Sequence, residues 1–311
     1  MKSLLRADFR RYYSCYFFYV CLTGCFLLTA YFFFRTKLQQ VDYIRQLSAG
    51  SLLMSELGAV SILGGIWGNG ILFATPVGVD AALAAFYAAT FVRKEFYGQA
   101  ARYKLAKGCS RRSVFLSLMT VCVTGAVVMR CANVLFLVLL AAVFEPLLLP
   151  LYLPDAWAFL LSLAILLTTT AALACFAVFV YFCLMKQGFY TVLIVLTLLL
   201  TLFYAAAEPL SLSTALSAPE YYVEADIYDG DAASGGADEA ERLIKNPQYV
   251  SGVRRVLYTV LYDGTPWGQE DQFGRSNRMP DRAGAFPICN AVYIAAFTAA
   301  GAAVFRKREL G

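Results

Sequence analysis

Long runs without a charged side chain recur along this sequence and constrain its fold more than any other feature. The runs 12–34 and 156–185 are each long enough to cross about 30 Å of hydrocarbon as a helix, which takes roughly 20 residues. Over the whole chain 60% of the residues are hydrophobic and 15% are charged, and the mean hydropathy is +0.62. A water-soluble domain carries about a quarter charged residues, because its surface must face water. The sequence therefore predicts an all-α membrane protein.

Six membrane-spanning helices are predicted from these runs. The apolar stretch 59–92 is too long for one perpendicular helix, and several glycines and Pro76 weaken any helix in it. Its spanning part is therefore placed at 70–92, and the approach from Leu57 is expected to be shallow or re-entrant. Only a tight turn at 186–188 separates the fourth helix from the fifth. The predicted spans are residues 12–34, 70–92, 114–144, 157–185, 189–206 and 286–305.

The distribution of charge predicts that both termini lie in the cytoplasm. Residues 93–112, between the second and third spans, contain seven Lys or Arg and one Glu. In contrast, residues 208–285, between the fifth and sixth spans, contain seven basic and thirteen acidic residues. Because loops rich in Lys and Arg stay on the cytoplasmic side, the first segment is expected inside the cell and the second outside.

Three units follow from this arrangement. Residues 1–206 hold the first five spans, with a cytoplasmic segment at 93–113, and residues 286–311 hold the sixth span and a cytoplasmic tail. The outer segment 207–285 is expected to form a small mixed or helical cap. Within it, apolar residues recur at helical spacing from Val253 to Leu261.

The cytoplasmic stretch 91–119 is the part of the chain that says most about function. It leaves the membrane with Glu95, runs a short basic helix with Arg102 and Lys104, and breaks at Gly108 before it re-enters. A basic helix held between two spans lies against the inner membrane surface. The alternative is that these charges only fix the topology.

This stretch resembles the first cytoplasmic loop of type-2 ABC transporter permeases from bacteria. Glu95 stands for an acidic residue of that family, residues 98–105 (GQAARYKL) for a Gly-Thr-Ile-Arg-Asn-Lys-Leu run, and residues 108–111 (GCSR) for a Gly-His-Ser-Arg turn. The departures are Gln99 for Thr, Ala for Ile, Tyr103 for Asn and Cys109 for His. Residues 246–252 (NPQYVSG) with 266–269 (PWGQ), and the chain end 304–310 (VFRKREL), resemble other parts of the same family.

The resemblance implies a permease subunit in a bacterial plasma membrane that exports an amphipathic substrate, such as a peptide antibiotic or a lipid-like molecule, by ATP-driven alternating access. The chain has no phosphate-binding loop of the GxxxxGK[ST] type, so ATP would be bound and hydrolysed by a separate ATPase subunit, and the permease itself would be neither an enzyme nor a cofactor-binding protein. A second permease copy, identical or different, and membrane lipids are the other expected partners, and no nucleic acid is expected. The ATPase contact is expected at Glu95, Gly98, Arg102, Lys104, Gly108 and Arg111.

Two charged residues lie inside the predicted spans. Asp80 in the second span and Arg130 in the third lie at heights that differ by about 6 Å, at roughly 1.5 Å per residue, so we expect them to form a pair. The pair would either hold the two helices together or make Asp80 a substrate or ion contact.

Two other functions are compatible with the same sequence. A secondary carrier could use Asp80 as its proton site, although no second half resembles the Gly-rich stretch before it. A membrane sensor or adaptor could bind partners through the outer loop without transport. Intramembrane enzymes that depend on histidine are excluded because the chain has no histidine.

Overall fold

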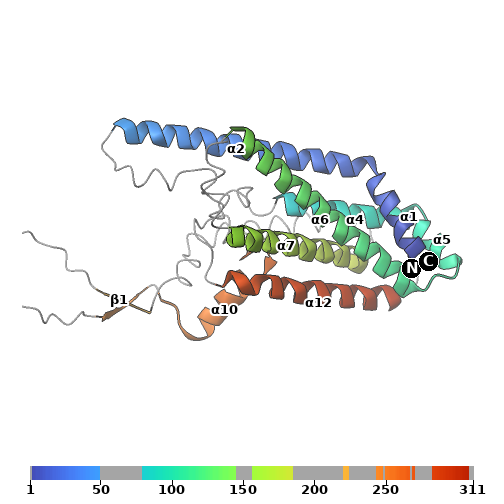
Figure 1. Ribbon diagram of the computed structural model, residues 1–311. Helices are drawn as coiled ribbons and strands as arrows, with labels where there is room; N and C mark the ends of the chain where they lie inside the picture. Colours follow the sequence, from blue (N-terminus) through green and yellow to red (C-terminus); the bar gives the residue numbers. More distant parts are fainter. Residues whose placement is uncertain are drawn as a thin grey trace, which may run out of the picture.

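In the computed structural model the described parts of the chain are mainly long helices. The structure describes residues 2–49, 79–144, 156–184, 220–223, 243–247, 249–266, 268–269 and 282–307. Figure 1 shows the helices running side by side along one long axis. The helices are α1 (Lys2–Tyr13), α2 (Tyr16–Ala49), α4 (Val79–Tyr97), α5 (Ala100–Ala106), α6 (Arg111–Phe144), α7 (Ala156–Leu184), α10 (Gly252–Tyr262) and α12 (Phe286–Lys307), with a 3₁₀ turn η4 (Ala283–Ala285) before the last.

Four of these helices are long and apolar enough to cross a membrane, which confirms the general prediction of a helical, multi-pass chain. The four candidate spans are Tyr16–Arg35, Arg111–Phe144, Leu160–Leu184 and Ala283–Lys307. They correspond to the first, third, fourth and sixth predicted spans. The second predicted span is described only from residue 79, where α4 begins, and the fifth, together with the approach from Leu57, lies outside the described residues.

The first predicted span, 12–34, begins four residues too early, and its end agrees with the candidate span Tyr16–Arg35 to within one residue. The helix is interrupted at Ser14 and Cys15. The Ser14 hydroxyl and backbone N–H both donate to the Arg10 carbonyl, at 2.6 and 3.0 Å, and the Cys15 N–H turns instead to the Tyr12 carbonyl at 3.4 Å. The preceding residues form the separate, amphipathic helix α1. At the other end α2 runs on to Ala49 because residues 35–49 contain neither Gly nor Pro before that point.

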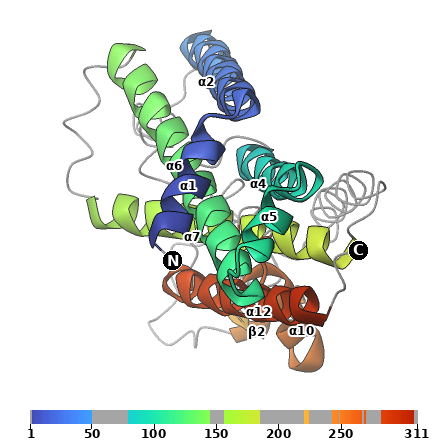
Figure 2. The same ribbon diagram turned by 90° about the vertical axis from the view of Figure 1, so that its right-hand side faces the viewer.

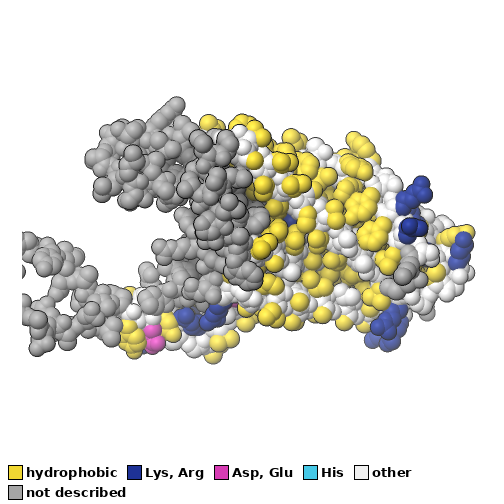
Figure 3. Space-filling model, in the orientation of Figure 1, with side chains coloured by type: hydrophobic (Ala, Val, Ile, Leu, Met, Phe, Trp, Pro, Cys, Tyr) yellow, Lys and Arg dark blue, Asp and Glu magenta, His cyan; other side chains and the backbone are white. Residues whose placement is uncertain are grey.

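Helix α7 lies at the centre of the described bundle. It packs against α4, α6 and α12. In the most apolar part of α7, 67% is buried inside the bundle, compared with 17–29% in the other three candidate spans. In Figure 2, α7 runs behind α6, with α4 above it and α12 below it. The face of the bundle seen in Figure 3 is largely apolar, and Leu27, Leu135 and Val292 are among the large apolar side chains that are exposed. An apolar flank of this kind suits lipid rather than water.

The two ends of the bundle differ in what they carry. At one end lie α1, α5 and the last turn of α12, and the Arg111 guanidinium donates to the Arg306 carbonyl there at 3.3 Å. Lys and Arg side chains gather at this end in Figure 3. At the other end lie α10 and a short antiparallel strand pair, β1 (Tyr221–Val223) with β2 (Leu243–Lys245), in which Tyr222 pairs with Ile244. The segment between the fifth and sixth predicted spans therefore contains both strand and helix.

Candidate functional site

The short helix α5 lies between α4 and α6, in the stretch that the sequence analysis marked for function. A Cβ at Gly98 would come 2.9 Å from the Lys94 carbonyl oxygen, so the chain leaves α4 through a position that favours glycine. The next residue, Gln99, adopts left-handed backbone angles (φ 59°) at the start of α5. After α5, Gly108 has φ +87°, a conformation that side chains other than glycine adopt at a cost. These two bends change the direction of the chain, so that α5 is a separate helix between α4 and α6.

Four charged side chains from three helices meet beneath α5. The Lys104 ammonium of α5 lies 2.6 Å from a carboxylate oxygen of Asp8 and 2.9 Å from one of Glu95. The Arg11 guanidinium contacts the same two carboxylates, at 2.9 Å from Asp8 and 3.2 Å from Glu95. We refer to Asp8, Arg11, Glu95 and Lys104 as the ionic cluster. It contains two acids and two bases and is neutral as a whole.

Most of the ionic cluster is removed from solvent. Asp8 is fully buried, and Glu95 and Lys104 are 5% and 6% exposed, whereas the Arg11 side chain remains 41% exposed. The second carboxylate oxygen of Asp8 accepts a hydrogen bond from the Ser117 hydroxyl of α6 at 2.7 Å. Buried charges are tolerated when they are paired and hydrogen-bonded in this way, and removal of one partner typically costs about 3–5 kcal/mol.

The ionic cluster fixes α5 to the bundle. Asp8 and Arg11 belong to α1, Glu95 to α4, Lys104 to α5, and Ser117 joins α6 to the same group. Ala101 is fully buried on the same side of α5 as Lys104. A displacement of α5 must therefore either break buried ion pairs or move α1, α4 and α6 with it.

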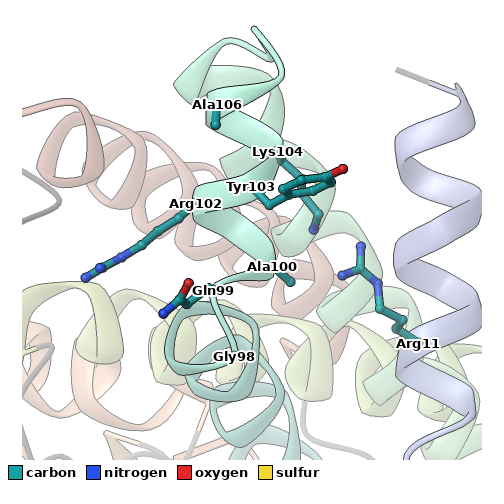
Figure 4. Close-up of a pocket in the computed structure, with 8 residues that line it drawn as sticks. All are labelled: Arg11, Gly98, Gln99, Ala100, Arg102, Tyr103, Lys104 and Ala106. Carbon is teal, nitrogen blue, oxygen red and sulfur yellow. The ribbon is translucent and has the colours of Figure 1, made fainter.

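The other side of α5 is open to solvent. Arg102 and Tyr103 are exposed, Tyr103 by 61%, and the Lys107 ammonium lies 4.5 Å from the centre of the Tyr103 ring. An open pocket of about 580 Å³ lies on one side of Tyr103, and a second of about 470 Å³ lies between α5 and α1. In Figure 4, Lys104 and Arg11 point toward one another across the space between α5 and α1, while Arg102 extends to the opposite side. The residues lining the first pocket are Arg11, Gly98, Gln99, Ala100, Arg102, Tyr103, Lys104 and Ala106.

The six residues predicted to contact an ATPase thus occupy different positions. Glu95 and Lys104 are buried in the ionic cluster and hold α5 in place. Arg102 and Arg111 are exposed, and Gly98 and Gly108 form the two bends that flank α5. Asp8, Arg11 and Ser117 were not among the predicted site residues. Their role has no local signal, because Asp8 lies 96 residues before Lys104 and 109 before Ser117.

Of the predicted intramembrane pair Asp80 and Arg130, the structure describes the side chain of Arg130 alone. Arg130 is buried in α6, with 2% of its surface exposed. Asp80 is in the first turn of α4, but its side chain lies outside the described part of the structure, so the pairing stays a prediction. A different polar contact joins α2 to α6, where the Thr29 hydroxyl donates to the Asn133 side-chain oxygen at 2.8 Å.

A second polar group, also absent from the sequence predictions, lies at the opposite end of the bundle. Asn290 of α12 is fully buried, and its amide nitrogen lies 3.0 Å from the Thr169 hydroxyl of α7 and 2.8 Å from the side-chain oxygen of Gln269. Gln269 in turn donates to the Asp263 carbonyl, directly after α10, at 2.8 Å. These bonds connect α12 to α7 and to the segment that carries α10. No group of three or more His, Cys, Asp or Glu suited to a metal ion occurs among the described residues.

Comparisons with known proteins identify no relative. No protein-family model matches the sequence, and neither the curated proteins nor the solved structures contain a match.

Proposed function

We propose that this chain is the membrane-spanning permease subunit of a type-2 ABC transporter and that α5 is its contact with a separate ATPase subunit. The proposal is based on the resemblance of residues 95–111 to the first cytoplasmic loop of that family, and on four described helices long and apolar enough to span a membrane. The six-span topology, with both termini in the cytoplasm of a bacterial cell, is part of the proposal.

The observation that carries the proposal is the two-sided construction of α5. Its outer side presents Arg102 and Tyr103, while its inner side is held by Lys104 in the ionic cluster. A force that a partner exerts on the outer side would be transmitted to α1 and α4 through buried ion pairs, and to α6 through the hydrogen bond from Ser117 to Asp8. A basic segment that only fixes topology needs no such anchorage, because charge alone decides orientation.

The complete transporter in this proposal contains two permease copies and two ATPase subunits that bind ATP. Nucleotide-driven closure of the ATPases would tilt the spans and alternate access to the two sides of the membrane. The exported substrate is proposed to be amphipathic, a peptide antibiotic or a lipid-like molecule, by resemblance to the family.

The test is purification of the tagged chain in mild detergent together with an ATPase subunit encoded beside it. We expect the ATPase to co-purify, and we expect Arg102→Glu to reduce the amount recovered about tenfold, because a reversed charge at the centre of a contact typically costs more than 1 kcal/mol. The matched control is the charge reversal Lys245→Glu, at an exposed position of β2 at the other end of the bundle.

Recovery of the unsubstituted chain and of Arg102→Glu with equal amounts of ATPase would contradict a contact at α5. If no ATPase accompanies even the unsubstituted chain, the permease assignment itself fails and a sensor or adaptor becomes the better explanation.

A further inference from the structure

Helix α10 exposes an apolar face that no described part of the chain covers. Val253, Val256, Leu257 and Val260 lie three or four residues apart and so share one side of the helix. Their exposed fractions are 86%, 63%, 53% and 55%. The sequence analysis predicted this helix with one apolar face, as part of a small cap, and did not say what the face contacts.

This exposure is unusual for such a short helix. An isolated helix of 11 residues is only marginally stable in water, and most helices of this length are stabilised by packing of the apolar side. Among the described residues of the chain, α10 buries only its last residue, Tyr262, at 1% exposure. The apolar face formed by Val253, Val256, Leu257 and Val260 therefore needs another apolar environment.

The position of α10 indicates which environment is available. Gln269 joins the residue after α10 to Asn290, and Asn290 lies in the second turn of α12, within the candidate span Ala283–Lys307. Figure 1 shows α10 beside the beginning of α12. On α12 itself, Ile288 and Val292 at this end are 68% and 64% exposed. The carboxyl end of α10 is therefore held close to the level at which the last candidate span begins.

The polar residues of α10 match a membrane surface. The helix contains no Asp or Glu, and Arg254 is exposed beside the apolar face. The guanidinium of Arg254 lies 5.9 Å from the Tyr258 ring, and that of Arg255 lies 4.7 Å from the Tyr249 ring. Arg pairs well with phosphate groups, and Tyr is enriched where the headgroups meet the hydrocarbon.

We propose that α10 lies in the membrane interface at this end of the bundle, with Val253, Val256, Leu257 and Val260 among the lipid acyl chains and Arg254 at the phosphate level. Amphipathic helices of this composition bury their apolar face about 5–10 Å into the boundary between headgroups and acyl chains. A second copy of the chain fits this face less well, because a two-fold contact between α10 helices would bring arginines together without an acid on either helix. The inference rests on the membrane placement of α12 and is independent of the ATPase.

Quenching of tryptophan fluorescence by brominated lipid tests this placement. The full chain is reconstituted into phosphatidylcholine vesicles whose acyl chains are brominated either near the headgroup or near the chain end. Val256→Trp is compared with the unsubstituted chain, whose three native tryptophans supply the background to be subtracted. We expect about a twofold loss of the added fluorescence with the shallow bromines and a smaller loss with the deep ones.

Two further variants separate the possible outcomes. Ile288→Trp, on the exposed side of α12, reports whether that helix is in the membrane at all, and Lys245→Trp, at an exposed position of β2, should not be quenched. Quenching at residue 288 without quenching at residue 256 would overturn the inference and leave the membrane-spanning proposal intact, as expected if a second copy covers α10. Absence of quenching at both positions would contradict both proposals, and stronger quenching of Val256→Trp by the deep bromines would contradict an interfacial position. Val260→Trp replaces Val256→Trp if the latter fails to give the circular dichroism of the unsubstituted protein.

Discussion

Lys104 of α5 and Asp8 of α1 form a buried ion pair of 2.6 Å across 96 residues of sequence. The N-terminal helix, which precedes the first candidate span, is thereby attached to the element proposed to receive the ATPase. Any force on α5 acts on α1 at the same time.

The ionic cluster should make a measurable contribution to stability. We expect Asp8→Asn to lower the free energy of unfolding by about 3–5 kcal/mol, because Lys104 and Arg11 lose a buried counter-charge. The measurement is denaturant or thermal unfolding of the purified protein in detergent. Glu220→Gln is the control, since Glu220 is exposed at the opposite end of the bundle, and it should change stability by less than about 0.5 kcal/mol.

The same pair should behave non-additively. Asp8→Asn combined with Lys104→Met is expected to cost about 0.5–3 kcal/mol less than the sum of the two single changes, because the double variant leaves neither charge unpaired at this contact. Additive single effects would show that the 2.6 Å contact does not couple the two residues energetically.

The bend after α5 should tolerate only residues that accept a left-handed conformation. Gly108→Ala is expected to destabilise the protein by about 1–2 kcal/mol, because φ at this position is +87°. Gly108→Asn should cost less, since Asn visits this conformation more readily. The control is Gly284→Ala, where φ is not positive and an added Cβ meets no atom within 4 Å, so that unfolding should be almost unchanged. Equal stability of Gly108→Ala and Gly284→Ala would contradict the bend.

The bonds at Asn290 should hold α10 in place. Asn290→Leu removes the contacts to Thr169 and Gln269, so we expect faster amide hydrogen exchange over residues 252–262, with the exchange of α5 unchanged. Exchange of α10 at the rate of the unsubstituted protein would show that Asn290 does not control this segment.

The proposed topology can be read with reporter proteins. Green fluorescent protein fused to either terminus should fluoresce, and alkaline phosphatase inserted between Gly235 and Gly236 should be active, because the acidic segment 208–285 is expected outside the cell. Active phosphatase at the C-terminus instead would reverse the orientation and remove α5 from the reach of a cytoplasmic ATPase.

The sequence analysis predicted the long helices well because the apolar runs that form them are local features. The span predicted at 114–144 corresponds to α6 at Arg111–Phe144, and that predicted at 157–185 corresponds to α7 at Ala156–Leu184. The break at Ser14 and Cys15 was missed, since neither residue is charged and both fit within an apolar run.

The candidate site was located by its sequence, but its construction was not predicted. A basic segment suggests a solvated surface, and nothing local distinguishes Lys104, which faces inward, from Arg102, which faces outward. That difference arises from the carboxylates of Glu95 and of Asp8, and Asp8 lies on a helix far away in the chain. Ser117, which donates a hydrogen bond to Asp8, looks like any small polar residue of an apolar helix. Contacts of this range depend on the packing of whole helices and leave no periodic pattern.

The long sequence separation within the ionic cluster also dictates an order of events at the ribosome. Asp8 is synthesised 96 residues before Lys104 and 109 before Ser117. The N-terminal helix must therefore wait, with its carboxylate hydrated, until the third predicted span has emerged. Only then can α1 take up its final place, so the first helix to be made cannot complete its buried contacts before the third predicted span has been synthesised.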